Sequence, residues 1–114
     1  MAYNIQLADR VREYLTESTN KNIEEKNMFG GLAFMINDKM CINVSGDNLM
    51  CRFNPKTIEE VASKMGYQPM VMKGREYKGY CYVSPEGFKT KQDFEYWINL
   101  CLDFNNEAKS SKKK

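Results

Sequence analysis

Histidine is absent from this 114-residue sequence. The protein therefore lacks the side chain most often used as a general base near neutral pH, which is also the commonest metal ligand. Its four cysteines, Cys41, Cys51, Cys81 and Cys101, are widely spaced and form no CxxC pair of the kind that zinc sites use. We expect no metal and no cofactor, and we interpret the cysteines as free buried thiols in a reducing compartment.

Long hydrophobic runs are missing as well. No stretch approaches the roughly 20 apolar residues that a membrane helix needs, and residues 1–15 carry charges throughout, unlike a signal peptide. The formal net charge of +2 is too small to indicate a nucleic-acid or membrane partner by itself. We expect a cytoplasmic protein with no membrane association.

The length and composition are typical of one globular domain, with 42% hydrophobic and 28% charged residues. Lysines crowd the last six positions, at Lys109, Lys112, Lys113 and Lys114. A cluster of like charges with no apolar residue cannot bury a core. We therefore predict a domain over residues 1–106 and a disordered, lysine-rich tail over residues 107–114.

Three segments have the pattern of amphipathic helices. From Asn4 to about Thr19, apolar residues recur at steps of three and four. Residues 54–66 begin with a capping asparagine followed by proline and end in glycine, and residues 90–104 begin with a capping threonine. The residues expected to face the core are Ile58, Val61, Ala62 and Met65 in the second helix and Phe94, Trp97, Ile98 and Cys101 in the third.

From residue 25 to residue 53 the period changes to two, and the apolar residues that alternate from Leu32 on predict three antiparallel strands joined by short turns. A two-residue turn at residues 46–47 keeps the apolar residues on one face. At the preceding turn a two-residue loop would scramble that face, whereas a three-residue loop over residues 37–39 pairs Phe34 with Ile42. Because a one-residue slip turns every side chain over, we predict the three-residue loop.

Residues 68–87 are typical of one more hairpin, turning near residues 73–76, with a bulge or a close backbone contact expected at Gly79. The predicted order is helix, three strands, helix, two strands, helix. Three helices cannot cover both faces of such a sheet. We predict an α+β, two-layer sandwich in which an antiparallel sheet of about five strands carries all helices on one face.

The glycine pair Gly30-Gly31 has two possible roles. Glycines that cradle a phosphate stand between a strand and a helix, whereas this pair precedes a predicted strand, and neither GxGxxG nor a P-loop pattern is present. We predict that the pair lets the backbone turn into the sheet beside Phe29.

Four segments in this order resemble the N-terminal domain of the TfoX/Sxy family. They are MFGGLAFMINDKMCINV (residues 28–44), DNLMCRF (residues 47–53), YQPMVMKGREYKGYCYVSPEG (residues 67–87) and DFEYWINLCLDF (residues 93–104). The similarity covers nearly the whole chain apart from the lysine-rich tail. Residues that match the pattern of the family are Met28, Phe29, Gly30, Gly31, Gly74, Arg75, Gly79, Tyr80 and Trp97.

The resemblance implies an α+β fold similar to secretion-chaperone-like domains, and it brings no established catalytic residue. Members of the family include regulators of natural competence that act with a cyclic-AMP-responsive transcription activator. Those regulators carry a second, helical domain after the one seen here, before which the present sequence ends.

We predict a non-enzymatic protein-interaction module, for which the resemblance implies a role in transcription regulation. With helices on one face, the reverse face of the sheet would be open and methionine-rich, and such apolar patches often mark partner surfaces. Three alternatives remain: docking of a partner protein, self-association into a homodimer, or cover by a terminus or loop. The candidate interface residues are Met35, Cys41, Asn43, Met50 and Arg52, beside Ala33, with Cys81 and Val83 as further candidates.

The second functional hypothesis is nucleic-acid binding through the hairpin at residues 73–82. Basic residues and tyrosines are interleaved there, a mixture that suits phosphate contacts and base stacking, although Glu76 interrupts the positive charge. The candidate contacts are Lys73, Arg75, Tyr77 and Lys78.

Catalysis is the third hypothesis, and its candidates are few. The cysteines have no histidine to activate them, and carboxylates such as Glu59, Glu60 and Asp93 fall on exposed helix faces or at caps. We therefore predict that the protein is not an enzyme.

Overall fold

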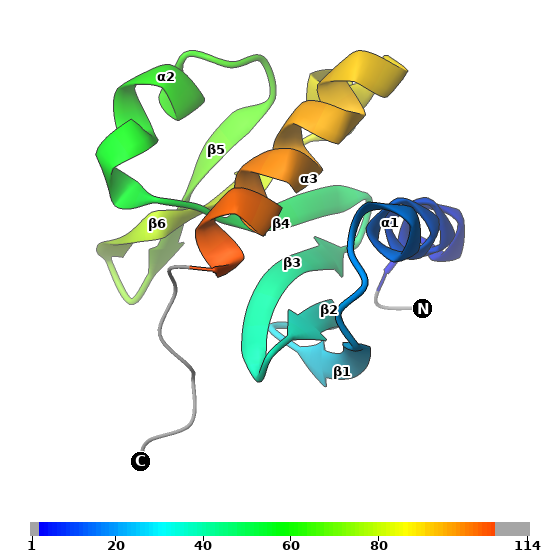
Figure 1. Ribbon diagram of the computed structural model, residues 1–114. Coiled ribbons are helices and arrows are strands. Elements are labelled where there is room, and N and C mark those ends of the chain that lie inside the picture. Colours follow the sequence, from blue (N-terminus) through cyan, green and yellow to red (C-terminus); the bar gives the residue numbers. More distant parts are fainter. Residues whose placement is uncertain (1–2, 107–114) are drawn as a thin grey trace.

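Six antiparallel strands form one open sheet, and three helices lie together on one of its faces (Figure 1). This computed structural model describes residues 3–106, so the predicted tail at residues 107–114 lies outside the described residues. The spatial order of the strands is β1-β2-β3-β4-β6-β5. The elements are α1 (Ile5–Ser18), β1 (Ile23–Met28), β2 (Gly31–Ile36), β3 (Lys39–Ser45), β4 (Asn48–Arg52), α2 (Ile58–Ala62), β5 (Tyr67–Met72), β6 (Arg75–Val83) and α3 (Lys91–Asn105).

The predicted α+β sandwich is confirmed, but the sheet has six strands because β1 was missed. This strand is polar and largely exposed, with Glu24, Glu25 and Lys26 at its centre. A strand with no buried face leaves no alternation of period two in the sequence. Charges along an edge strand also discourage pairing with other chains.

The predicted three-residue loop between β2 and β3 is wrong. Asn37 and Asp38 both have positive φ, at 55° and 63°, and form a two-residue turn that pairs Ile36 with Lys39. The register then shifts between Phe34 and Met35, and Cys41 is an extra residue on β3 at this point. Beyond the shift, Phe34 pairs with Ile42, as predicted. This β-bulge therefore allows a two-residue turn while the apolar side chains of β2 and β3 beyond it stay on one face of the sheet.

The glycine pair acts on the backbone, as predicted. Phe29 and Gly30 have φ of 54° and 72° and form the tight turn between β1 and β2. Gly31 begins β2 and lies directly against β3, where a Cβ atom would stand 2.1 Å from the carbonyl oxygen of Val44. The first glycine therefore supplies a left-handed conformation and the second a close approach of two strands.

Thr90 caps the third helix, as predicted, and Asn4, for which no capping role was predicted, caps the first helix. Leu7 N–H donates to Asn4 Oδ1 at 3.1 Å, and Asp93 N–H donates to Thr90 Oγ1 at 3.0 Å. These bonds satisfy amide groups that have no partner inside the helix.

The second helix is shorter than predicted. A 3₁₀ turn, η1 (Pro55–Thr57), precedes the single short segment α2. Val61 is buried, whereas Met65 is 71% exposed and takes no part in the predicted stripe. The chain leaves the helix early and brings Gly66 against Gly87, where a Cβ on Gly66 would lie 2.8 Å from the Gly87 Cα.

The main core lies between the helices and the sheet. It contains the predicted inward residues of α3, among them Trp97, which is 1% exposed and donates its Nε1–H to the carbonyl oxygen of Gly87 at 3.1 Å. The indole therefore has both an apolar environment and a satisfied polar atom. None of the helices in residues 3–106 is long and apolar enough to cross a membrane.

A second core occupies the reverse face of the sheet, which is strongly curved at β3 (Figure 1). No residue of a helix belongs to this cluster. Side chains of the strands themselves pack together there, and flexible methionines suit such an irregular space. The members, all at most 5% exposed, are Ala33, Met35, Met40, Met50 and Met70, and Met28, Tyr80 and Tyr82 pack against them half-buried.

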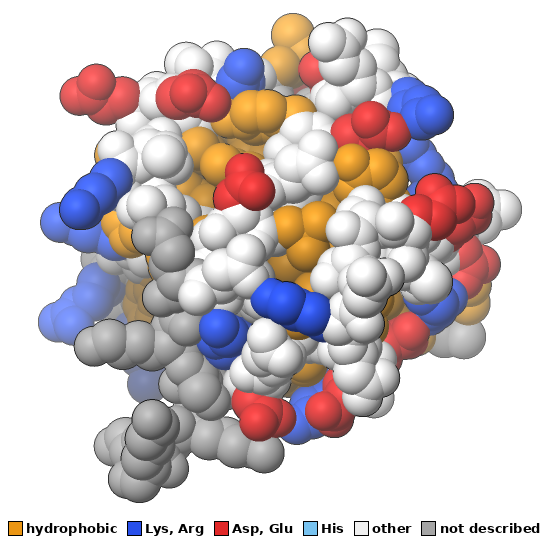
Figure 2. Space-filling view, in the orientation of Figure 1, with side chains coloured by type: hydrophobic (Ala, Val, Ile, Leu, Met, Phe, Trp, Pro, Cys, Tyr) orange, Lys and Arg blue, Asp and Glu red, His pale blue; other side chains and the backbone are white. Residues whose placement is uncertain are grey.

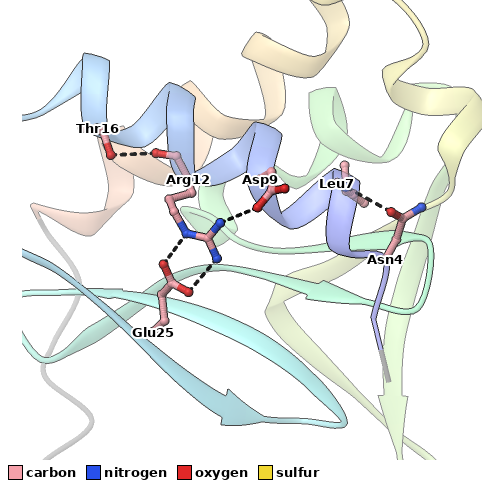
Figure 3. A network of polar contacts seen from close by, with 6 residues as sticks. All are labelled: Asn4, Leu7, Asp9, Arg12, Thr16 and Glu25. Carbon is pink, nitrogen blue, oxygen red and sulfur yellow. Dashed lines mark hydrogen bonds and ion pairs between the residues drawn. The ribbon is translucent and has the colours of Figure 1, made fainter. Parts of the chain in front are cut away.

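Charges of both signs are interspersed on the face shown in Figure 2. One network joins α1 to the edge strand β1 (Figure 3). The guanidinium of Arg12 donates to both carboxylate oxygens of Glu25, at 2.5 and 2.8 Å, and also to Asp9 at 2.5 Å. The hydrogen bonds from Arg12 lower the pKa of Glu25 below its ordinary value.

Replacing Glu25 with glutamine should lower the free energy of unfolding by no more than about 1 kcal/mol at neutral pH, because the pair is partly exposed. A carboxylate whose pKa is lowered on folding stabilises the protein above its unfolded pKa and loses that effect as pH falls through the folded pKa. Urea titrations should therefore show a difference at pH 7 that disappears on acidification below about pH 4. A difference that persists at low pH would contradict this assignment.

Candidate docking site at the β5–β6 hairpin

The predicted open face does not exist as a surface of the folded chain. Met35 is 4% exposed, and Asn43 and Met50 are fully buried. Cys41 lies in the main core on the helix side, because the bulge in β3 turns it over. The prediction that these residues are exposed on the reverse face is therefore wrong.

Cys81 and Val83 were further candidates for the open reverse face, and this prediction is wrong as well. Both lie in the main core, on the helix face. Arg52 is half-buried, and its guanidinium carbon lies 5.7 Å from the ring centroid of Tyr80 and 5.8 Å from that of Phe104. It thus lies where the sheet meets the end of α3, within the range of cation–π contacts.

Asn43 has a structural role next to the glycine turn. Its Nδ2 donates to the carbonyl oxygen of Met28 at 3.0 Å, whereas Oδ1 has no hydrogen-bond partner in the described part of the chain. A Cβ on Gly31 would stand 2.6 Å from that Oδ1. The side chain therefore holds the β1–β2 turn against β3.

The four cysteines are free and buried, as predicted, and they gather in the main core. Cys51 and Cys81 are direct cross-strand partners, and the Cys101 thiol of α3 is within hydrogen-bonding reach of Cys51. Burial raises the pKa of Cys41 and Cys51 well above the ordinary value. Thiols in such surroundings are poor nucleophiles.

The β5–β6 hairpin turns at Lys73 and Gly74, within the predicted range. Its pairing shifts between Pro69 and Val71, so that residues 77–80 of β6 stand opposite a single residue of β5. Gly79, with φ of 83°, accepts a hydrogen bond at its carbonyl oxygen from Phe53 N–H at 2.8 Å. Both alternatives expected at Gly79 are therefore found: the glycine lies in the bulge, and a Cβ there would stand 3.1 Å from the carbonyl oxygen of Phe53.

A pocket of about 300 Å³ lies between this bulge and the segment after β4. Pro55, Lys56 and Ile58 form one wall, and Tyr67 with residues 76–80 forms the other. Burial raises the pKa of Tyr67, with smaller contributions from neighbouring groups, including Glu76. The aromatic and aliphatic side chains make the interior apolar, and the charged side chains stand among them.

The candidate nucleic-acid contacts all lie exposed on this hairpin. Tyr77 and Lys78 line the pocket, whereas Lys73 lies in the turn and Arg75 follows it. The prediction missed the wall at residues 55–58, because nothing in a linear pattern indicates that this segment lies beside β6. The only sign of this contact in the sequence is the glycine at position 79. A Cβ atom added to Gly79 would stand 3.2 Å from Pro55 Cγ.

Positive charge prevails around the pocket. Lys56, Lys73, Arg75 and Lys78 make no ion pair within residues 3–106, and Glu76 is the one acidic residue among those that line the pocket. Figure 2 shows Lys and Arg side chains along its left edge, the side on which Figure 1 places this hairpin. The site is thus an apolar depression beside cations that make no ion pair with another described residue.

The family profile of the TfoX N-terminal domain matches residues 13–105. The match extends from within α1 to the last residue of α3, and so includes the second core, most of the main core and the hairpin. The chain belongs to the TfoX N-terminal domain family. No curated protein and no solved structure matches it. The pocket of this TfoX N-terminal domain is therefore interpreted from its own residues.

Proposed function

We propose that this TfoX N-terminal domain is a non-enzymatic protein-interaction module, acting in the cytoplasm in transcription regulation, and that it docks its partner at the β5–β6 pocket. The observation that carries the proposal is the pocket itself, a concave apolar site on a chain whose reverse sheet face is closed. The family supports a regulatory role, because its members include competence regulators.

The rim of the pocket has the character of a protein-binding surface. Tyr77 is 40% exposed beside an apolar interior, and Val71, which does not line the pocket but pairs with the lining residue Glu76, is 55% exposed. Tyrosine is enriched among the residues that dominate binding energies, and such residues pair with pockets. A partner side chain that enters the pocket would bury Tyr77 and gain apolar contacts.

The non-enzymatic part of the proposal is supported by the thiols. All four are buried in the main core, and the raised pKa of Cys51 and Cys41 keeps these two protonated at neutral pH. In the described residues, no group of three or more cysteine or carboxylate side chains could hold a metal ion.

Nucleic-acid binding is the second candidate function. The cations of the hairpin, which make no ion pair with another described residue, favour it beside the exposed Tyr77 ring. Phosphate contacts would make the affinity fall steeply with salt concentration.

A photo-crosslinking residue in place of Tyr77 should yield discrete protein adducts in cells that express the full chain. The matched control places the same residue at Met65, which is apolar and 71% exposed but lies outside the pocket. Adducts at position 77 should disappear when Lys56 is also changed to glutamate, and mass spectrometry should identify the same protein in repeated experiments. No adduct at position 77, or the same adducts at both positions, would refute docking at this pocket.

A further inference from the structure

We infer that the partner presents an acidic segment with one large apolar side chain, and that this side chain enters the pocket while the flanking carboxylates meet the lysines around it. The inference rests on the proposed function and specifies the chemistry of the partner. It follows from the size of the pocket, the charges around it and the edge strand beside it.

Size limits what the pocket can accept. Its volume of about 300 Å³ is at the lower end of the range for ligand sites. A single large side chain fits this space, whereas a broad protein surface would contact only the rim. Pro55, Ile58 and the tyrosine rings would surround an apolar group on several sides, which is the setting in which one anchoring residue contributes strongly.

The positive charges around the pocket favour an acidic segment of the partner. Lys56 and Lys78 lie in opposite walls of the pocket, and Lys73 and Arg75 continue the positive charge toward the turn. None of the four has an acidic partner within the described residues, so carboxylates of a partner would not have to displace an existing ion pair. Charge complementarity of this kind guides encounter and orients the bound segment.

The edge strand β5, which lies beside the pocket, indicates that the partner is recognised mainly through its side chains. β5 is the outermost strand, and a peptide could in principle extend the sheet there. Pro69 has no N–H to donate, and the register shift that follows it interrupts the regular ladder. Main-chain pairing would therefore be short, and the pocket and lysines must supply the specificity.

A protein segment fits the site better than a nucleic acid does. Stacking platforms present aromatic faces along an open basic groove. Here Tyr67 and Tyr80 are half-buried in the pocket walls, and the Arg52 guanidinium already stands over the Tyr80 ring. Glu76 at the rim would repel phosphates, while a flexible acidic peptide can place its carboxylates away from it.

The test is fluorescence anisotropy with the full chain and a labelled short peptide that has glutamates on both sides of a single central phenylalanine. We expect saturable binding that weakens at least about tenfold when the glutamates become glutamines or when the phenylalanine becomes alanine. Tyr77→Ala and Lys78→Glu should weaken binding to a similar extent. Matched controls at exposed sites outside the pocket, Met65→Ala and Lys26→Glu, should leave it unchanged within about twofold.

The outcomes separate this inference from the proposed function. If position 77 captures a partner in cells but the acidic peptide does not bind, or binds equally well with glutamine in place of glutamate, the inference is overturned and the docking site stands. If oligothymidylate binds instead, with a steep salt dependence lost in Lys78→Glu, the inference is overturned in favour of nucleic acid. If neither probe binds and no adduct forms, both proposals fall.

Discussion

Replacing Gly31 with alanine should destabilise the protein by about 3 kcal/mol, whereas the same change at the adjacent Gly30 should cost only about 1 kcal/mol. At Gly31 the new Cβ would stand 2.1 Å from the carbonyl oxygen of Val44 and 2.6 Å from Asn43 Oδ1. The first of these atoms belongs to the backbone of β3, so relief requires two paired strands to separate. At Gly30 the added Cβ would have no atom within 4 Å outside the adjacent residues. The only cost comes from the left-handed φ of 72°, which residues with a side chain rarely adopt.

Urea unfolding of the wild type and both variants measures this difference directly. The two positions are neighbours and receive the same methyl group, so effects on the unfolded chain are nearly equal and cancel in the comparison. Equal losses at both sites would show that the close contact between β2 and β3 does not exist, and that the pair serves only as a flexible turn.

Replacing Met50 with glutamate should prevent stable folding, or lower the free energy of unfolding by more than about 4 kcal/mol. Met50 is fully buried among methionines on the reverse face. A carboxyl group there must lose its hydration or remain protonated, and both are costly. Met50→Leu, which keeps an apolar side chain of similar size, should cost less than about 1.5 kcal/mol.

Circular dichroism and urea titration of the two variants decide whether the reverse face is closed. A glutamate variant that stays folded and as stable as the leucine variant would mean that this face is open to solvent, as the sequence pattern suggested. Size-exclusion chromatography of the same samples would then show whether the face serves self-association.

Local features of the fold could be predicted because each depends on residues close together in the chain. The N-cap at Thr90, the tight turn after Met28 and the bulge at Gly79 all follow from local backbone chemistry. The layer arrangement was also predictable, since the helical stripes and one face of the strands share a single apolar pattern.

The errors come from contacts between segments that are distant in sequence. The polar strand β1 leaves no periodic signal, and its place is set by pairing with β2 and by the ion pair from Arg12. The bulge at Cys41 is invisible to a pattern that counts residues in a fixed register. Tyr77 and Lys78 were identified only as candidate nucleic-acid contacts, and neither the pocket nor its wall at Pro55 was predicted.

The sequence by itself determined the α+β class, the helix caps, the turns at glycine and the family. Only the tertiary structure decided that the reverse face is closed and that a pocket opens beside Gly79. The physical reason is the curvature of the sheet. A period of two in the sequence assigns each side chain of a strand to one face of the sheet. The bulges and the twist of the sheet then determine whether the side chains of that face pack against one another and exclude solvent. Met50 is buried and Tyr77 exposed for that reason.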